Sequence, residues 1–130
     1  GLGRLYGLFS YGSLPPQSRD EARASLATAS QIGSTVDEYA EATSSIDQAQ
    51  SLRDFDAKPL IVLTAGRGHD AEWLPAQDDM ATLSTNSLHR VVADATHASL
   101  IEDEDDATAT SEAIRDVVAS VRTSTPLAEP

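Results

Sequence analysis

The stretch from Leu60 to Thr64 is the part of the chain that most constrains its fold. It is a continuous apolar run with β-branched residues, and it lies between Pro59 and the pair Ala65-Gly66. A strand with one face in water alternates apolar and polar residues, whereas a strand covered on both faces can be apolar throughout. The run therefore predicts a strand that is buried on both faces, as in a parallel sheet.

The residues after this strand alternate between helical and extended patterns. After a polar loop at residues 67–70, we expect a helix over residues 73–83, a strand over residues 90–93 and a helix over residues 108–122. Strand–helix–strand–helix is typical of a parallel βαβα unit, so residues 57–124 are predicted to have an α/β fold. Two strands cannot cover their own edges and faces, so we expect further strands to complete the sheet.

Residues 1–56 are predicted to be helical. An apolar helix face is expected near the start, with the i, i+3, i+4, i+7 spacing of Leu2, Leu5, Tyr6 and Phe9. Two capping-box patterns, Ser18–Glu21 and Thr35–Glu38, each predict the start of a helix. The first helix is expected to run to about Gln31 and stop at Gly33; the second is expected to reach about Arg53, with a break at Ser44-Ser45. Residues 125–130 are predicted to be a frayed tail.

Composition excludes several classes of function. The chain has 21 acidic and 9 basic residues and a net charge of −12, which argues against nucleic-acid binding and against docking on anionic membranes. It has no cysteine, so disulfides, thiolate nucleophiles and cysteine-bound zinc are excluded. No apolar run approaches the roughly 18 residues of a transmembrane segment. Hydrophobic residues make up 40% of the chain, which is typical of a folded protein.

Two chemically reactive residues follow the two predicted strands. Asp70 lies in the loop after the first strand, and His97 lies in the loop after the second. In open parallel sheets, functional residues gather in the loops beyond the carboxyl ends of the strands. We therefore expect Asp70 and His97 to come out at the same end of the sheet. A carboxylate that orients an imidazole, which in turn accepts a proton from a hydroxyl nucleophile, is the arrangement of a catalytic triad.

The same region resembles the last two strand–helix units of an α/β-hydrolase. The matching features are Pro59 to Gly66, a loop acid followed by Trp73 and Gln77, then Val91 to His97, and a final amphipathic helix. In that family the triad runs in the order nucleophile, acid, histidine. The resemblance implies that His97 is the catalytic base and Asp70 the acid. It also implies that residues 1–56 correspond to the helical cap, or lid, and that no cofactor is needed.

One departure from the family pattern sets the expected role of the chain. The nucleophile motif Gly-x-Ser-x-Gly does not occur, and Gly12-Ser13 lacks its flanking residues and precedes two prolines. We therefore expect the chain by itself to be inactive. The resemblance implies that it is the C-terminal part of a serine-type hydrolase that cleaves an ester or other acyl bond. Its expected partners are the N-terminal half of the same enzyme, which carries the nucleophile, and a small-molecule substrate.

Other interpretations of these residues remain open at this stage. Asp70 could instead cap the following helix, Asp94 or Asp56 could replace it as the acid, or the acid could follow an earlier strand outside the match. A metal site at His69 and His89 is disfavoured because the ligand spacing of zinc sites is missing.

The remaining candidates are better explained as ordinary structure. The acidic residues 102–106 lack the alternating ligands of a calcium loop and fit a solvated loop before the last helix. Trp73 and Met80 share a helix face and could line a substrate pocket, but core packing is the commoner role of such residues. The apolar residues 2–9 could line an acyl pocket as a lid.

Two interpretations other than an enzyme are also open. The chain could be a non-catalytic, hydrolase-like interaction module that binds a partner through its sheet edge and helical half. A free-standing helical regulatory protein would explain residues 1–56, but it would leave the βαβα pattern without a role.

Overall fold

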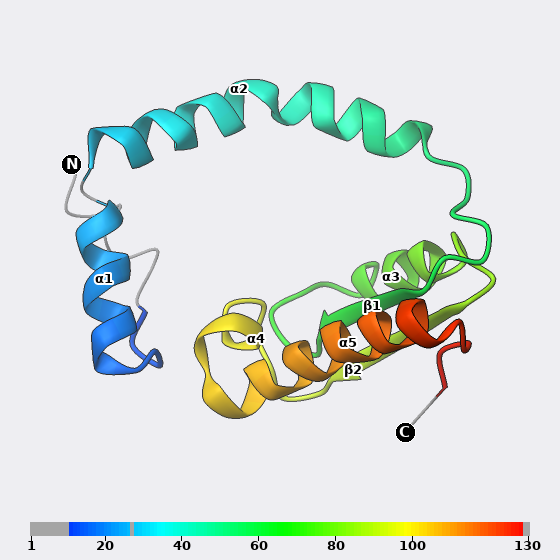
Figure 1. The fold of residues 1–130 in the computed structure, drawn as a ribbon. Coiled ribbons are helices and arrows are strands. Elements are labelled where there is room, and N and C mark those ends of the chain that lie inside the picture. The colour runs from blue at the N-terminus through cyan, green and yellow to red at the C-terminus, as the bar shows by residue number, and fades with distance from the viewer. Residues whose placement is uncertain (1–10, 27, 129–130) are drawn as a thin grey trace. The chain divides into compact units, whose positions relative to one another are not determined.

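The computed structural model describes residues 11–26 and 28–128 and divides the chain into two units. The first unit extends to Leu52 and the second begins at Arg53. The chain folds in the order α1 (Pro16–Leu26), α2 (Ala29–Ser51), β1 (Leu60–Ala65), α3 (Trp73–Ala81), β2 (Ser87–Val92), α4 (Ser99–Glu102) and α5 (Glu104–Thr123), as labelled in Figure 1. No helix of the described residues combines the length and apolar character needed to cross a membrane.

The first unit contains two helices whose bounds differ from those predicted. Ser18 lies inside α1, and Thr35 lies inside α2, so neither capping box starts a helix. The N-cap of α2 is Thr28 instead, whose hydroxyl accepts a hydrogen bond from the Gln31 amide at 3.1 Å. A single capping group is worth only about 1 kcal/mol, so a capping-box pattern can lie inside a continuous helix without starting a new one.

Helix α2 also continues through the two predicted breaks. Gly33, the expected stop, lies in its second turn, and Ser44-Ser45 lie in its interior. A glycine within a helix costs about 1 kcal/mol relative to alanine, which is too little to interrupt a helix of this length. The apolar helix face predicted for residues 2–9 lies outside the described residues.

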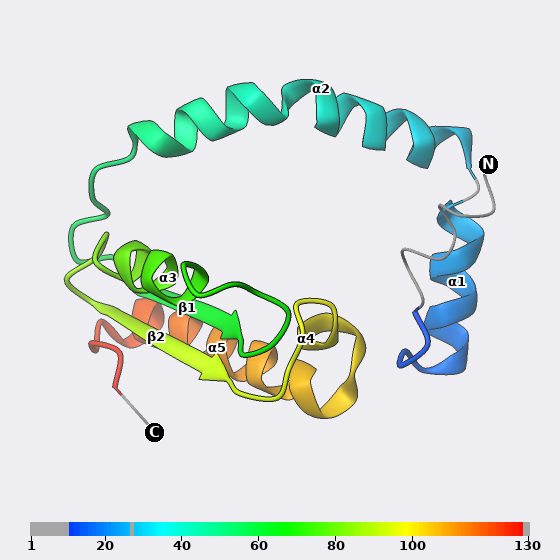
Figure 2. The same ribbon diagram turned by 180° about the vertical axis from the view of Figure 1, so that it is seen from behind.

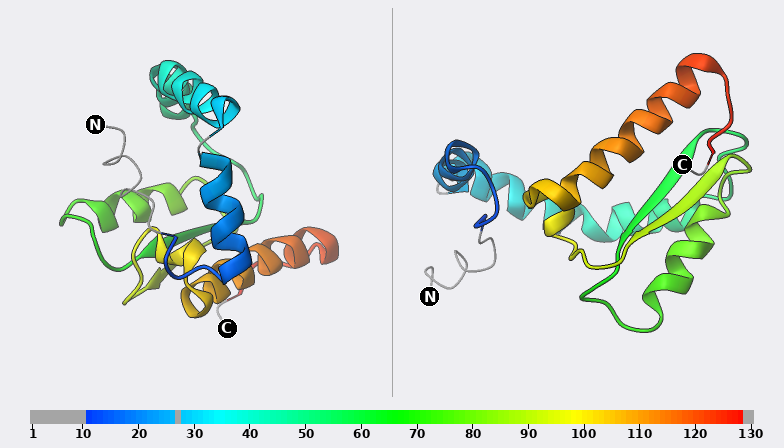
Figure 3. Two further views of the ribbon diagram at one scale, coloured as in Figure 1. Left: turned by 90° about the vertical axis from the view of Figure 1, so that its left-hand side faces the viewer. Right: turned by 90° about the horizontal axis from the view of Figure 1, so that it is seen from below.

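The second unit is built around a two-stranded parallel sheet. β1 pairs with β2 over its whole length, from Leu60 opposite Ser87 to Ala65 opposite Val92. The arrows of both strands point the same way in Figure 2, and α3 forms the crossover between them. Helices α3 and α5 lie on opposite sides of the sheet (Figure 3). The α/β class predicted from the alternating pattern is therefore confirmed, with a small open sheet.

Most boundaries in this unit shift by a few residues from those predicted. β2 begins at Ser87 rather than Arg90, and α3 ends at Ala81 rather than Leu83. The acidic run is not a loop, because its last three residues form the first turn of α5. Asp103 is the N-cap of α5 and accepts hydrogen bonds from the amides of Asp105 and Asp106. Carboxylates at this position also stabilise the helix through its dipole.

The tail is attached to the sheet unit rather than frayed over its first part. The hydroxyl of Ser120 donates to the Thr125 carbonyl at 2.6 Å, and the Leu127 amide donates to the Asn86 side chain at 2.8 Å. These contacts hold residues 125–127 against the amino end of β2. The amphipathic pattern of the last helix contains no signal for them, because they depend on side chains from distant parts of the chain.

The buried core of the second unit is small. Ala65, Ala95 and Leu100 are buried together, with Leu63 and Val92 packed against them. By contrast, several large apolar side chains of the unit are exposed, including Val91, Ile101, Ile114, Val118 and Val121. Among residues 11–26 and 28–128, β1 pairs with another strand on one edge only, and no described strand covers the backbone hydrogen-bonding groups of its other edge.

Gly66 allows the chain to leave β1 beside β2. A Cβ atom built on Gly66 would lie 2.6 Å from the Cα of Ala93 and still closer to the Ala93 carbonyl oxygen. We predict that Gly66→Ala destabilises this unit by about 1–3 kcal/mol, because the two backbones must separate. Urea denaturation followed by the fluorescence of Trp73, the only tryptophan, measures the effect.

Gly33→Ala is the matched control for this substitution. Gly33 has no atom within 4 Å of a built Cβ, and it lies in α2. This variant is expected to raise the helical circular dichroism signal and to leave the Trp73 transition unchanged, because alanine favours helix over glycine. A Gly66→Ala variant as stable as the original chain would contradict the close approach.

Candidate functional site

The loops after the two strands meet at the carboxyl end of the sheet. The amide of Gly66 donates to the Val92 carbonyl at 2.8 Å, and the amide of Arg67 donates to the Ala95 carbonyl at 3.0 Å. The Arg67 guanidinium also forms an ion pair with Asp94 at 2.5 Å. These contacts continue the pairing of the strands into the loops, so that residues 67–70 and 94–97 lie at the same end.

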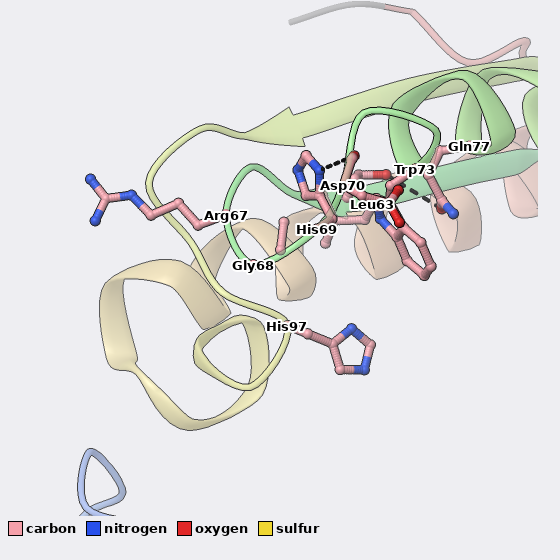
Figure 4. A pocket seen from close by; sticks show the side chains of 10 residues that line it. Leu63, Arg67, Gly68, His69, Asp70, Trp73, Gln77 and His97 are labelled. Atoms are coloured by element: carbon pink, nitrogen blue, oxygen red, sulfur yellow. Dashed lines mark hydrogen bonds between the residues drawn. The ribbon is translucent and has the colours of Figure 1, made fainter.

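An open cavity of about 660 Å³ lies at this end of the sheet. Asp70 and His97 both line it, together with Leu63, Thr64, Ala65, Arg67, Gly68, His69, Trp73 and Gln77. Figure 4 shows Asp70, Trp73 and Gln77 close together, His97 on its own loop, and the Arg67 side chain extending away from the cluster. Trp73 is thus at the cavity, whereas Met80, which shares its helix face, is not among the lining residues.

Asp70 and His97 line one cavity, but they are not joined by a hydrogen bond in the described structure. Both residues are exposed. The Asp70 carboxylate accepts a hydrogen bond from the Glu72 amide at 3.1 Å and thereby braces the turn that leads into α3. The helix-capping role that the sequence left open for Asp70 is not observed, because the N-cap of α3 is Glu72 and Asp70 lies in the turn before it. The second carboxylate oxygen has no part in the hydrogen bond with the Glu72 amide, so Asp70 can brace the turn and accept another donor.

The other carboxylates considered as the acid lie in different places. Asp94 follows β2 and pairs with Arg67, so it is at the same end of the sheet as His97. Asp56 precedes β1, and its carbonyl accepts hydrogen bonds from Ser84 and Thr85 at the opposite end. The position of Asp56 is incompatible with a role beside His97.

His89 takes part in a hydrogen-bonded chain that the sequence did not reveal. Its Nδ1 lies 2.6 Å from the Asp78 carboxylate, and its Nε2 lies 2.9 Å from the hydroxyl of Thr64. If Nδ1 carries the proton and donates to Asp78, then Nε2 accepts the Thr64 hydroxyl proton. The chain links α3, β2 and β1 on one face of the sheet. Thr64 is buried, so its hydroxyl needs this partner.

Gln77 is the second buried polar side chain at this place. Its carbonyl oxygen lies 3.5 Å from the Thr64 hydroxyl, and both residues line the cavity. The signal that could have revealed this cluster was weak: a threonine at the end of an apolar strand and a histidine within a second strand. Only the register, which sets Val62 opposite His89, brings the histidine beside the threonine.

No metal centre is found among the described residues. No three histidine, aspartate or glutamate side chains in residues 11–26 and 28–128 gather closely enough to hold a metal ion. His69 and His89, considered as ligands from the sequence, have different neighbours. His69 Nδ1 lies 3.1 Å from the Asp70 carbonyl oxygen, whereas His89 contacts Asp78 and Thr64.

Comparisons with protein-family models, with characterised proteins and with solved structures give no match to this chain.

We predict that removing the Thr64 hydroxyl destabilises the second unit. Thr64→Val keeps the shape of the side chain but leaves His89 Nε2 without its partner, which should cost about 1–3 kcal/mol. Thr108→Val is the matched control, because Thr108 is exposed and bonds only within α5, and it should change stability by less than about 0.5 kcal/mol. Urea denaturation measures both variants. Equal effects of the two substitutions would rule out a stabilising role for the buried chain.

Proposed function

We propose that this chain is the C-terminal part of a serine-type α/β-hydrolase that cleaves an ester or other acyl bond. The observation that carries the proposal is the position of Asp70 and His97. They lie in the loops that follow two adjacent parallel strands, and they line one cavity. An acid and a base displayed in this way suit the last two members of a nucleophile–acid–histidine triad.

In the proposed mechanism, His97 acts first as a base and then as an acid. Its Nε2 accepts the proton of a serine hydroxyl supplied by the N-terminal half, while the serine oxygen attacks the acyl carbon. His97 then gives that proton to the departing alkoxide, and an acyl-enzyme forms. Water, deprotonated by the same imidazole, releases the acid and restores the serine. Asp70 accepts a hydrogen bond from Nδ1, which holds the productive tautomer and stabilises the imidazolium.

The proposal requires the N-terminal half to bring the two loops together. Asp70 and His97 lie in exposed loops, and the carboxylate still has acceptor capacity beyond its bond to the Glu72 amide. Catalytic hydrogen bonds are often long or absent before the full site assembles. Packing of a further segment over the cavity would confine the imidazole and separate the site from bulk solvent, while still admitting the one water that hydrolyses the acyl-enzyme.

The open edge of β1 supports the existence of such a partner. The amides of Leu60 and Gly66 donate to residues of the β2 strand and its flanks. Because backbone groups alternate along a strand, the amides of Ile61, Leu63 and Ala65 point to the opposite, open edge. An apolar groove runs beside that edge, lined by Ile61, Leu63, Thr110, Ala113, Ile114, Val117 and Val118. A further parallel strand would pair with the edge and cover the groove.

Hydrogen exchange tests the pairing within a single strand. In the 130-residue chain, the amides of Val62 and Thr64 should exchange slowly, and those of Ile61 and Leu63 should exchange quickly, because only the first pair is bonded to β2. In the complete polypeptide encoded by the gene, all four should be protected. Fast exchange of Ile61 and Leu63 in that complete polypeptide would contradict strand addition at this edge.

A fluorophosphonate probe tests the chemistry. We expect the 130-residue chain alone to remain unlabelled and the complete polypeptide to be labelled at a serine outside it. His97→Ala in the complete polypeptide should abolish labelling and lower kcat for p-nitrophenyl acetate by about 10³-fold or more, because the base is lost. Asp70→Asn should lower kcat by about 10²- to 10⁴-fold through the wrong tautomer.

His69→Ala is the control for these variants. His69 lines the same cavity, but it has no role in the proposed mechanism. Its removal should leave kcat within about threefold of the original enzyme, which separates loss of the base from general damage to the loop. Labelling that survives His97→Ala would refute the assignment of the base. A complete polypeptide with no esterase activity and no labelling would instead support the non-catalytic interaction module.

A further inference from the structure

Helix α3 buries a polar side chain while two of its large apolar side chains remain exposed. Gln77 has only 9% of its surface exposed, whereas Trp73 and Met80 of the same helix are 44% and 43% exposed. A primary amide has a donor end and an acceptor end, and burying them is unfavourable unless both find hydrogen-bond partners. Packing against the sheet alone therefore does not explain a glutamine at this position.

One end of the Gln77 amide is engaged, and the other end is free within the described part of the chain. The engaged end lies 3.5 Å from the Thr64 hydroxyl oxygen, and no described residue forms a hydrogen bond with the other end. Gln77 lines the cavity that Asp70 and His97 also line, and Figure 4 shows it close to Asp70. The free end is thus available to a molecule in the cavity.

The chain of Asp78, His89 and Thr64 determines which end of the amide is free. An ionised carboxylate only accepts hydrogen bonds, so Asp78 requires the proton of His89 to be on Nδ1, 2.6 Å away. The neutral imidazole then accepts, at Nε2, the single hydroxyl proton of Thr64 over a distance of 2.9 Å. The Thr64 oxygen has only lone pairs left for Gln77, so a favourable contact needs the amide nitrogen there.

A half-turn of the terminal amide of Gln77 provides this contact. The oxygen and nitrogen of a glutamine amide exchange places in such a rotation with almost no change of shape. With the carbonyl oxygen 3.5 Å from the Thr64 oxygen, two acceptors face each other. After the rotation, Nε2 donates to the Thr64 oxygen, and the carbonyl oxygen is presented to the cavity as an acceptor.

We propose that Gln77 is a specificity-determining residue whose carbonyl oxygen accepts a hydrogen bond from a hydroxyl group of the substrate. The inference rests on the proposed function, which makes this cavity the acyl-transfer site. An amide carbonyl has no net charge, so it suits a neutral hydroxyl better than an ammonium group, which loses more hydration on entering the cavity. An ester without a hydroxyl would cover the carbonyl and leave it unpaired, which weakens binding.

Two pairs of esters, in each of which a hydroxyl replaces a methyl group, test the preference. Methyl lactate and methyl isobutyrate differ in the acyl part, whereas hydroxyethyl acetate and propyl acetate differ in the alcohol part. Calorimetric titration of the complete polypeptide with His97→Ala measures binding without turnover, at about pH 8, where an imidazole is normally neutral. In at least one pair the hydroxylated ester should bind about fivefold more tightly. Equal binding within both pairs would overturn the proposal.

Substitutions at position 77, made in the same His97→Ala polypeptide, identify the group responsible. Gln77→Met keeps the length of the side chain but removes its polar ends, so the preference should disappear. Gln77→Glu keeps an acceptor toward the cavity, so the preference should remain. The matched control is Gln48→Met, which should leave the preference unchanged, because Gln48 is exposed on α2 and its amide donates to Ser44 in the same helix.

Two results with these variants would contradict the assignment of an acceptor at Gln77. One is a preference that survives Gln77→Met, and the other is a preference that is lost in a folded Gln77→Glu variant. Circular dichroism establishes that each variant is folded. The Gln77→Met comparison decides by itself if Gln77→Glu does not fold.

Turnover separates this inference from the proposed function. In the complete polypeptide with His97 intact, Gln77→Met should lower kcat/KM for the hydroxylated ester about fivefold relative to its methyl counterpart. A binding preference that depends on Gln77, without hydrolysis or fluorophosphonate labelling, would refute the hydrolase and keep Gln77 as a ligand-binding residue. Hydrolysis and labelling without any preference for a hydroxyl would refute the role of Gln77 alone.

Discussion

The parallel pairing of β1 with β2 is the contact on which the rest of the second unit depends. Its register continues beyond the strands, where Gly66 passes close to Ala93 and Arg67 bonds to the Ala95 carbonyl. Because parallel strands end on the same side, the loops that follow them meet, and both contribute residues to the open cavity at this end of the sheet. A helix on each side of the sheet holds this arrangement, and the Asp78–His89–Thr64 chain links α3 to both strands.

Around this paired sheet, the second unit leaves much of its apolar surface exposed. Its buried core is limited to a few residues around Ala95, while large apolar side chains of α5 remain exposed. The groove between the free edge of β1 and α5 has the apolar lining of a protein interior. In the hydrolase that we propose, an N-terminal half would supply the next strand, the nucleophile and the cover of the cavity.

The prediction of elements from sequence succeeded where the pattern was long and periodic. The apolar run that begins at Leu60 and the helix predicted over residues 108–122 correspond to β1 and α5, and the α/β class followed from the alternation of strands and helices. The predicted stops at Gly33 and Ser44-Ser45 were wrong, because continued helix formation outweighs the small local cost of these residues. The start of β2 was missed because Ser87 and His89 are polar, and their strand conformation is fixed by pairing with β1.

The sequence predicted that Asp70 and His97 lie at the same end of the sheet, because each lies in the loop that directly follows a predicted strand. The chain of Asp78, His89 and Thr64 could not be read in the same way, since its members lie up to 25 residues apart and meet only through the strand register.

The sequence by itself determined the alternation of strand and helix, the acidic charge, and the presence of an acid and a histidine after the two strands, because these depend on neighbours along the chain. The tertiary structure decided which polar groups are buried together, which edge of the sheet is free, and that Asp70 and His97 share a cavity without a bond between them. These depend on distances between residues that are remote in sequence, and such distances are set by packing.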